Sequence, residues 1–401
     1  MKPIYLVVTP FFPTPDSFRG PYVLDQVKAI ERTGRYRIVV FKPCGLWRRK
    51  NPYEYDGISV HYVPSFFTPS YLFNGFGGGL NGRNLIKQLR ILGISHSNIA
   101  VVHVHTASFA CYATALKKAN KHIKTVIQYH DPDPYQIRNG KWAQWRPNAM
   151  YRAKKLISQF KYIDLHLCIS KKVEYNLTHF PIPHPEECYD SYKRALIVVK
   201  DIPSPQNLNT YVLYNGVDIS SFHPIDGLKD SSIFKIGCVA NFIDWKDQMT
   251  LIEAVDLLVK NGRHDNIRVS FVGSGITKQE CMDYICNRKL QKYFIIEKEV
   301  HHSDLIRYYN SLDLFVLPSY FEGFGCVFTE AAACGVPFMG CVNQGYSEYV
   351  CDKNRWLIHP KDYMQLAKLI ETQSLEENAQ KLSKPLNIDI LVNDFLDYIV
   401  H

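Results

Sequence analysis

The chain has 401 residues, an apolar fraction of 46%, a charged fraction of 21% and a formal net charge of +9. This length exceeds what one ordinary core accommodates and predicts two domains, and the composition is typical of soluble globular proteins. No segment approaches the roughly 18 consecutive apolar residues of a membrane span, and the opening apolar run is too short for a secretory signal. The sequence therefore predicts a cytoplasmic protein that is soluble or held on a membrane surface.

The 11 cysteines are scattered singly, and no CxxC pair occurs. A zinc or redox site built from cysteine pairs is therefore disfavoured. Most of them, such as Cys168 and Cys238, fall within apolar patterns. That placement is typical of buried, reduced thiols in the cytoplasm.

Positive charge is concentrated in the first half of the chain. Residues 1–217 contain 29 Lys and Arg against 13 Asp and Glu, a balance of +16, whereas the remainder contains 18 against 25, a balance of −7. A basic face of this kind suits nucleic acid, anionic lipid or a phosphate-bearing substrate. Nucleic acid is the weaker option, because no nucleic-acid-binding module is recognisable among these charges.

The first half alternates short apolar runs with helix-like segments. The strand candidates are IYLVV (4–8), YRIVVF (36–41), VVHVH (101–105), TVIQYH (125–130) and LHLCIS (165–170). Amphipathic stretches such as ASFACYATALKKAN lie between them. Continuous apolar strands separated by helices predict a parallel sheet that is covered on both faces.

The alternation stops across roughly 180–232, where Pro, Asn, Asp and Ser accumulate, and it then resumes. The later strand candidates are FKIGCVA, IRVSFVG, YFIIEKEV, LDLFVLPS and VPFMGC. The sequence therefore predicts an α/β fold with two doubly wound, Rossmann-like parallel-sheet domains, residues 1–218 and 219–385, that face each other across a ligand cleft. The last helix-like segment, residues 386–401, either crosses back to the first domain or packs on the second.

The most informative segment is LDLFVLPSYFEGFGCVFTEAAACGVPFMG, residues 312–340. A buried strand is followed by a loop and then by a helix of small residues that carries Glu330. The loop contains Glu322, Gly323, Phe324 and Gly325. Eight residues of α-helix span about 12 Å with an angular offset of roughly 80°, so both carboxylates can face one cleft. Carboxylates accept hydrogen bonds from sugar hydroxyls, and loop amides at a helix N-terminus favour a diphosphate, so the segment predicts a nucleotide-sugar site.

This segment resembles the signature of glycosyltransferase family 4 enzymes of the GT-B fold, in which two glutamates are separated by seven residues. Further segments in the family's order and spacing are PFFPTPDSFRG, VVHVH, QYHD, ISKK, YNGVDISSFHP, VANFIDWKD, FVGSG and GYSEYV. With the glutamate motif, the matching segments cover about 350 residues. The resemblance implies a retaining transferase that uses a nucleotide sugar and needs no metal or other cofactor.

The resemblance also implies roles for four side chains. Glu330 would hold the ribose hydroxyls of the donor, and Glu322 would hold hydroxyls of the transferred sugar. Lys246 would neutralise the diphosphate, and its alternative is a solvated lysine at the start of a helix. His130, at the end of a first-domain strand, would face the sugar and act with Glu322 at the reacting centre. Its alternative is a buried structural histidine.

Three positions depart from the family pattern. Gly20, assigned here to the donor site, stands alone after Arg19 where paired glycines are usual. Asn241, also assigned to the donor site, stands where many members have an arginine. Either this asparagine contributes only a neutral hydrogen bond, or Arg19 supplies the missing charge. Gln344 and Gly345 stand where a pair of glycines is common.

Three further signals favour less specific interpretations. Gly77, Gly79 and Gly82 form a GxGxxG pattern without a convincing preceding strand, which favours a mobile loop on the acceptor side over a dinucleotide site. The DxD sequence at 131–133 directly follows His130 and is predicted to form a turn rather than a metal site. The basic stretches 117–124 and 141–161, the second with Trp142, Trp145, Tyr151 and Phe160, predict contact with a bilayer, and a solvated helix face is the alternative.

Together these patterns predict a retaining hexosyltransferase with a UDP- or GDP-type sugar donor. The expected acceptor is a saccharide or lipid-linked saccharide at the inner face of a bacterial plasma membrane, as in capsule or O-antigen biosynthesis. An anionic membrane surface is an expected partner and nucleic acid is not. Two alternatives stay open: another GT-B activity, such as a sugar nucleotide epimerase or phosphorylase, and a non-catalytic sugar nucleotide or membrane-binding protein.

Overall fold

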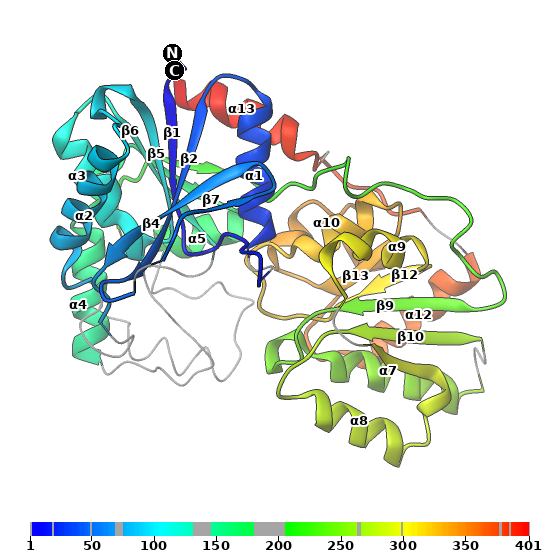
Figure 1. Ribbon diagram of the computed structural model, residues 1–401. Helices are drawn as coiled ribbons and strands as arrows, with labels where there is room; N and C mark the ends of the chain where they lie inside the picture. The colour runs from blue at the N-terminus through cyan, green and yellow to red at the C-terminus, as the bar shows by residue number, and fades with distance from the viewer. Residues whose placement is uncertain are drawn as a thin grey trace. The chain divides into compact units, whose positions relative to one another are not determined.

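The computed structural model describes residues 2–17, 20–48, 50–68, 75–130, 146–179, 205–262, 266–297, 300–376, 379–384 and 386–400. The chain forms two compact units (Figure 1). Unit 1 comprises Met1–Asn215 together with Ile388–His401, and unit 2 comprises Gly216–Asn387. Each unit is an α/β unit around a largely parallel sheet, which confirms the predicted fold class. The boundaries lie within three residues of those predicted from the sequence.

Unit 1 is built on an eight-stranded sheet in the order β3-β4-β2-β1-β5-β6-β7-β8. Its strands are β1 (Ile4–Val8), β2 (Arg37–Gly45), β3 (Tyr53–Tyr55), β4 (Ile58–Ser65), β5 (Ile99–His105), β6 (Lys124–Tyr129), β7 (Leu165–Cys168) and β8 (Thr210–Val212). Neighbouring strands are parallel apart from the antiparallel β3–β4 pair. Every residue of β1 is buried, as expected for a central strand that is covered on both faces.

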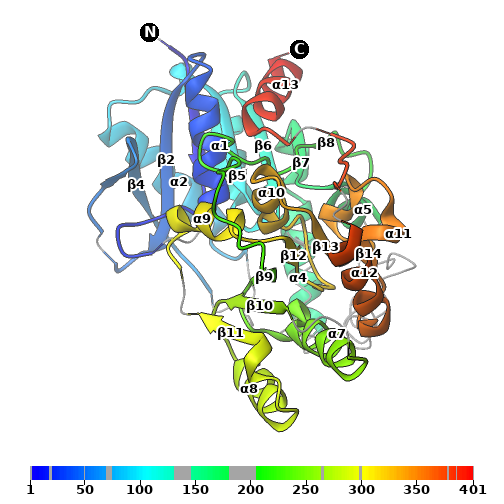
Figure 2. The same ribbon diagram turned by 90° about the vertical axis from the view of Figure 1, so that its right-hand side faces the viewer.

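Helices cover both faces of this sheet. They are α1 (Pro21–Arg32), α2 (Gly78–Ile91), α3 (Ala110–Ala119), α4 (Arg146–Ile157), α5 (Lys171–His179) and α13 (Ile388–Val400). Figure 1 shows α2, α3 and α4 together on one side of the sheet and α1 with α13 on the other, and Figure 2 shows α1 and α13 again near each other. The chain therefore returns to unit 1 at its end, through α13.

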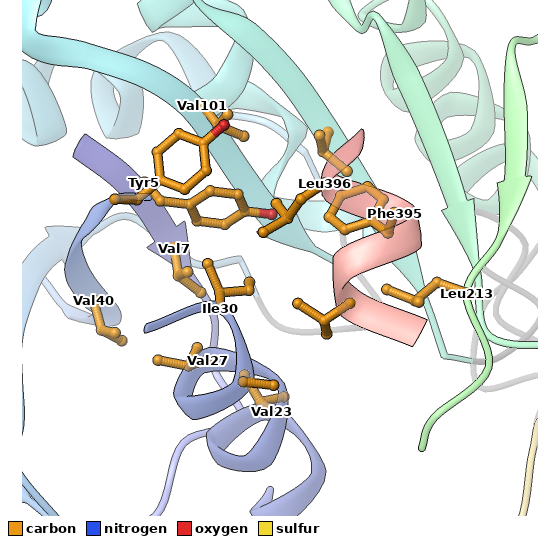
Figure 3. Close-up of a cluster of buried hydrophobic side chains, with 14 of the residues drawn as sticks. Tyr5, Val7, Val23, Val27, Ile30, Val40, Val101, Leu213, Phe395 and Leu396 are labelled. Carbon is orange, nitrogen blue, oxygen red and sulfur yellow. The ribbon is translucent and has the colours of Figure 1, made fainter. Parts of the chain in front are cut away.

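A shared core holds α13 against α1 and the sheet (Figure 3). The buried residues of α13 recur on one face of the helix and are Ile388, Val392, Phe395, Leu396 and Ile399. They join Tyr5 and Val7 of β1 and Val23, Val27 and Ile30 of α1. Exposed ion pairs, Arg32 with Asp389 and Arg35 with Asp397, flank this core. Since such surface pairs contribute little, the apolar face carries most of the packing energy.

The two chain segments that enter and leave unit 2 are paired with each other. Val217 forms a parallel β-bridge with Asn387. Its backbone N–H donates to the carbonyl of Leu386 at 2.8 Å. The first and last residues of unit 2 are thus held together by backbone hydrogen bonds.

Unit 2 has a six-stranded parallel sheet in the order β11-β10-β9-β12-β13-β14. Its strands are β9 (Phe234–Val239), β10 (Ile267–Val272), β11 (Phe294–Glu297), β12 (Leu314–Val316), β13 (Phe338–Cys341) and β14 (Leu357–Ile358). Its α-helices are α7 (Gln248–Lys260), α8 (Lys278–Asn287), α9 (Leu305–Asn310), α10 (Cys326–Ala333), α11 (Lys353–Trp356) and α12 (Tyr363–Glu376). Within the described ranges of both units, no helix combines the length and hydropathy that crossing a bilayer requires.

Candidate functional site

Lys246 and Glu322 form an ion pair just beyond the carboxyl ends of the unit 2 strands. Lys246 closes η4 (Asp244–Lys246), the turn that follows β9, and Glu322 lies in the loop that follows β12. Lys246 Nζ donates a hydrogen bond to Glu322 Oε1. The lysine side chain is 20% exposed and the glutamate side chain 10%, so each charge is largely desolvated and is compensated by the other. The structure thus brings together two side chains that the sequence predicts in one site.

Backbone and amide contacts hold the two loops in register. The Ser319 hydroxyl and the Tyr320 backbone N–H both donate to the carbonyl of Trp245, each at 3.0 Å. The backbone N–H of Glu322 donates to Oε1 of Gln344 at 2.8 Å. Gln344, which departs from the family pattern, therefore fixes the backbone from which the Glu322 side chain extends.

The loop between Glu322 and α10 lies against Gly345. A Cβ atom at Gly345 would lie 2.2 Å from the carbonyl oxygen of Gly323 and 2.7 Å from Cα of Phe324, so only glycine permits this close approach. The helix α10 begins directly after Gly325. Glu322 lies in the loop and only Glu330 in the helix, so helical geometry does not describe the spacing of the two glutamates, and their separation of about 12 Å stays a prediction. The loop amides do lie at the start of α10, as the sequence predicts.

Glu330 lies on α10 with another side chain on each of its carboxylate oxygens. The Tyr309 hydroxyl donates to Oε2 at 2.8 Å, and His302 Nε2 lies 3.3 Å from Oε1. Tyr309 is fully buried, and burial together with the negative charge of Glu330 raises the pKa of its phenol well above the ordinary value. The Phe222 ring packs edge-on against both partners, with ring centroids 5.2 Å from His302 and 6.0 Å from Tyr309. Glu330 is therefore held in one orientation.

Asn241 lies directly after β9, on the same edge of the sheet as Lys246. Its side chain is exposed, and its carbonyl accepts a hydrogen bond from the Gln248 side chain at 3.0 Å. The next residue, Phe242, exchanges backbone hydrogen bonds with the loop after β10, to Ser274 at 2.8 Å and from Thr277 at 3.1 Å. The turn is therefore fixed, and at this position it presents a neutral amide.

His130 directly follows β6 in unit 1 and is held by a second histidine. Its Nε2 lies 2.8 Å from Nδ1 of His105, and the two rings are within 8° of parallel. His103 stacks against His105 at 4.6 Å and is hydrogen-bonded to the Tyr5 hydroxyl at 2.9 Å. Burial lowers the pKa of His103 and His130 to about 3 and that of His105 well below its ordinary value. All three imidazoles are therefore neutral near pH 7.

Gly20 opens α1 beside His130. It has a φ of 93°, and a Cβ atom there would lie 2.6 Å from the carbonyl carbon and oxygen of Phe11, so no other residue fits. The rings of Phe11 and Tyr22 lie 6.1 Å and 5.1 Å from that of His130. The Gly20 turn and His130 thus meet at one edge of the unit 1 sheet. Arg19 and the DxD sequence at 131–133 lie outside the described residues.

Gly77, Gly79 and Gly82 are not in a mobile loop, so that prediction is wrong. Gly77 caps the start of α2, and the other two glycines lie within the helix. The helix forms here because its buried residues, which include Leu85 and Leu89, recur at helical spacing and α2 packs along α3.

Sequence patterns of known families match both units. The pattern described as Glycosyltransferase Family 4 matches residues 20–186, and the one described as Glycosyl transferases group 1 matches residues 223–385. The capsular polysaccharide biosynthesis glycosyltransferase CapM of Staphylococcus aureus is 30% identical over 284 residues, which cover 64% of this chain and 72% of CapM. The chain belongs to the family 4 glycosyltransferases. This transferase is therefore an enzyme, as the sequence predicts.

Other relatives of the transferase differ in how much of their length they share with it. Alpha-monoglucosyldiacylglycerol synthase of Acholeplasma laidlawii is 25% identical over 350 residues, 84% of this chain and 81% of the synthase. Protein CapJ of Staphylococcus aureus is 29% identical over 160 residues, only 38% of this chain and 40% of CapJ.

Solved structures confirm the GT-B fold of the transferase. Sucrose-phosphate synthase from Thermosynechococcus elongatus aligns with a TM-score of 0.72 at 15% identity, over 99% of this chain and 98% of the synthase. Anabaena Alr3699/HepE in complex with UDP aligns with a TM-score of 0.65 at 15% identity, over 100% of both chains. At such identities the likeness concerns the fold alone.

Proposed function

We propose that this transferase moves a sugar from a nucleotide diphosphate sugar to an acceptor with retention of configuration at the anomeric carbon. The observation that carries the proposal is the segment around α10, where Glu322 is paired with Lys246 and Glu330 is held by Tyr309. The complex of HepE with UDP, in a chain of the same fold, supports a nucleotide donor.

Each part of the donor has a chemically suited group in unit 2. The carboxylate of Glu330 accepts hydrogen bonds from the ribose hydroxyls, and Glu322 accepts them from hydroxyls of the transferred sugar. The loop amides that precede α10, from Gly323 to Gly325, receive the diphosphate together with Lys246. Lys246 carries three donor hydrogens, so it serves the diphosphate while one hydrogen stays with Glu322. Asn241 adds a neutral donor beside it.

The reaction requires stabilisation of negative charge on the leaving diphosphate. Lys246 and the amides before α10 supply this stabilisation as the bond to the anomeric carbon breaks. In this proposal Glu322 is a positioning residue rather than a covalent nucleophile, and Lys246 orients its carboxylate through Oε1. His130 stays neutral at pH 7 and offers the sugar a hydrogen bond without adding charge. The proposal includes no metal, so EDTA should leave the rate unchanged.

The proposed acceptor is a lipid-linked saccharide of bacterial surface polysaccharide synthesis at the inner face of the plasma membrane. Two observations support it: the +16 balance of residues 1–217, and relatives whose names specify capsular polysaccharide biosynthesis and a glucosyldiacylglycerol product. A basic surface attracts both anionic membranes and diphosphate-linked lipids.

The test is a thermal-shift panel of UDP, GDP, ADP and their sugar conjugates on three variants. A ligand that binds the folded state raises the melting temperature. Glu330→Gln should lose most of the shift with free nucleotide, whereas Glu322→Gln should keep that shift and lose the extra shift from the sugar. Glu376→Gln, at an exposed ion pair of the same unit, is the matched control and should behave like the parent. Equal losses in the first two variants would contradict these roles, and an inverted anomeric configuration in the product, read by NMR, would contradict retention.

A further inference from the structure

The helices on one face of unit 1 carry only positive charge. Over their ranges, α2 contains three Lys or Arg, α3 two and α4 four, and none of the three contains Asp or Glu. By contrast α13, on the opposite face, contains three Asp and no Lys or Arg. The three helices lie on one side of the sheet (Figure 1), so their cations, apart from the buried Arg152, contribute a basic face without helix-borne carboxylates.

A groove of about 610 Å³ opens on this face. Four cationic side chains line it: Arg83 from α2, Lys118 from α3, Lys155 from α4, and Lys161 from the turn after α4. None of the described residues that line the groove is Asp or Glu. Cations gathered in a concave surface without carboxylates favour an anionic ligand of comparable size.

Two of these four cationic side chains lie close to the ring of Tyr162. The ammonium groups of Lys118 and Lys161 lie 4.7 Å and 5.3 Å from the centroid of its ring. Two like charges therefore lie within cation–π distance of one ring, and like charges this close to one group repel each other. Gly75, which also lines the groove, lets the stem of Lys155 approach closely, since a Cβ atom there would lie 3.3 Å from Lys155 Cγ. An oxyanion in the groove would relieve this repulsion by accepting hydrogen bonds from several cations at once.

Exposed large apolar side chains adjoin the groove through Phe76 and Leu80, which neighbour its lining residues Gly75 and Gly79 in the chain. They are Phe67 (49% exposed), Phe76 (59%) and Leu80 (44%), at the end of β4 and the start of α2, and Trp47 (94%) in the loop after β2. The ends of β2 and β4 are adjacent, because Gly45 pairs with Ser65. Exposed aromatic and aliphatic side chains next to cations are typical of surfaces that lie in the headgroup region of a bilayer. Phe160 is buried, so the prediction that this residue contacts a bilayer is wrong. Trp142 and Trp145, which belong to the same prediction, lie outside the described residues.

We propose that this groove binds the phosphate groups of anionic phospholipids, with Phe67, Phe76 and Leu80 inserted beside them. The occupant is a bilayer rather than a soluble anion because the cations and the exposed apolar side chains adjoin on one face. The inference deepens the proposed function, since a lipid-linked acceptor is reached at the same surface. Vesicle binding needs no donor, so it is measured independently of the transfer reaction.

The experiment measures binding of the full chain to vesicles of phosphatidylcholine with and without phosphatidylglycerol. The groove variant is Lys118→Gln with Lys155→Gln and Lys161→Gln. Each lysine near an anionic surface accounts for roughly a fivefold change in affinity, so this variant should bind roughly a hundredfold more weakly. The control removes the same charge from exposed lysines of unit 2, by Lys289→Gln, Lys292→Gln and Lys368→Gln, and should bind within about threefold of the parent.

A second pair of variants tests the apolar contribution. Phe67→Ser with Phe76→Ser should weaken binding by roughly tenfold, whereas Ile276→Ser with Leu375→Ser, at exposed sites of unit 2, should not. Melting temperatures and nucleotide-induced shifts should be unchanged in all four variants.

Three results would overturn the proposal. One is no preference of the parent for phosphatidylglycerol vesicles, and another is equal weakening by the groove and control charge variants. The third is a thermal shift of the parent with glycerol phosphate, absent from the groove variant, without vesicle binding. This last result would assign the groove to a soluble phosphate. If the groove variant loses vesicle binding but still turns over the sugar donor, the proposed transferase function is unaffected.

Discussion

The carboxylate of Glu330 is oriented by a hydrogen bond from the buried phenol of Tyr309. Tyr309 donates to the carboxylate from a fully buried position, so a phenylalanine there would leave a carboxylate oxygen without this donor. Hydrogen bonds to charged groups contribute about 1.5–3 kcal/mol, so Tyr309→Phe should lower the free energy of unfolding by about 2 kcal/mol. The released carboxylate should also bind nucleotide roughly fivefold more weakly, by calorimetry.

Tyr308 provides the matched control for this prediction. It is also buried, and its hydroxyl donates to the backbone carbonyl of Ser270 at 2.7 Å rather than to a glutamate. Tyr308→Phe should therefore destabilise unit 2 by about 1 kcal/mol or somewhat more while leaving nucleotide affinity unchanged. If both substitutions changed affinity equally, Tyr309 would have no specific role in orienting Glu330.

At the scale of elements, α13 is required for the stability of unit 1. Phe395 is fully buried among residues of β1, α1 and β8. Replacing a buried phenylalanine by alanine costs about 3–5 kcal/mol, because apolar contact is lost and a cavity remains. Phe395→Ala should lower the free energy of unfolding of unit 1 by that amount, measured by hydrogen exchange of β1 and β5.

Ile390 on the same helix is 46% exposed and serves as the control. Ile390→Ala should cost less than about 1 kcal/mol, because little of its side chain leaves water on folding. Similar costs for the two substitutions would mean that α13 does not contribute through its buried face.

The strands that the sequence predicts are those with continuous apolar runs. The central strands of both sheets have this pattern, and the sequence predicts each of them. The missed strand β4, ISVHYVPS, mixes polar residues and a proline with its apolar ones, and β3, β8 and β14 have only two or three residues each. Short strands at or near a sheet edge bury one face or less, so their composition carries little signal.

Residue spacing alone predicts the candidate site only where its residues are close in sequence, and Lys246, 76 residues before its partner Glu322, is placed there by the family resemblance. The motif from Glu322 to Glu330 is local, and so its residues could be placed together. Tyr309 and His302 contact Glu330 from 21 and 28 residues earlier, through the packing of α9 and of the turn η6 (His302–Asp304) on α10. No spacing rule links such positions, because the parallel sheet decides which helices become neighbours.

At the scale of the whole molecule, the two units contain buried ionisable groups of opposite kind. In unit 1, burial lowers the pKa of His103 and His130 to about 3, that of His166 to about 4, and that of His105 well below its ordinary value. In unit 2, burial raises the pKa of Asp247 to about 6. Both shifts disfavour the charged form, so they link protonation to folding with opposite signs.

Acidification from pH 7.5 to 5.5 should therefore affect the two units in opposite directions. Below about pH 6.5 a histidine becomes protonated in the unfolded chain but stays neutral when it is buried in the folded unit. Each of the four buried histidines should therefore lower the free energy of unfolding of unit 1 by about 1 kcal/mol at pH 5.5. Folded Asp247 takes up a proton near pH 6 that its unfolded form does not, which stabilises unit 2 by less than about 1 kcal/mol. Hydrogen exchange should show faster opening of β5 and β6 and unchanged or slower opening of α7.

One substitution in each unit separates these contributions. His166→Gln removes one titrating group and should reduce the loss of stability of unit 1 by about a quarter, even though it also breaks the hydrogen bond with Tyr129. Asp247→Asn removes the carboxyl and should abolish the small gain of unit 2. Because most exposed carboxylates stay ionised down to about pH 5, the measurement is confined to this range, where the histidines dominate. If acidification lowered the stability of both units alike, the prediction would be wrong. Such a result would mean that unit 2, like unit 1, binds additional protons when it unfolds.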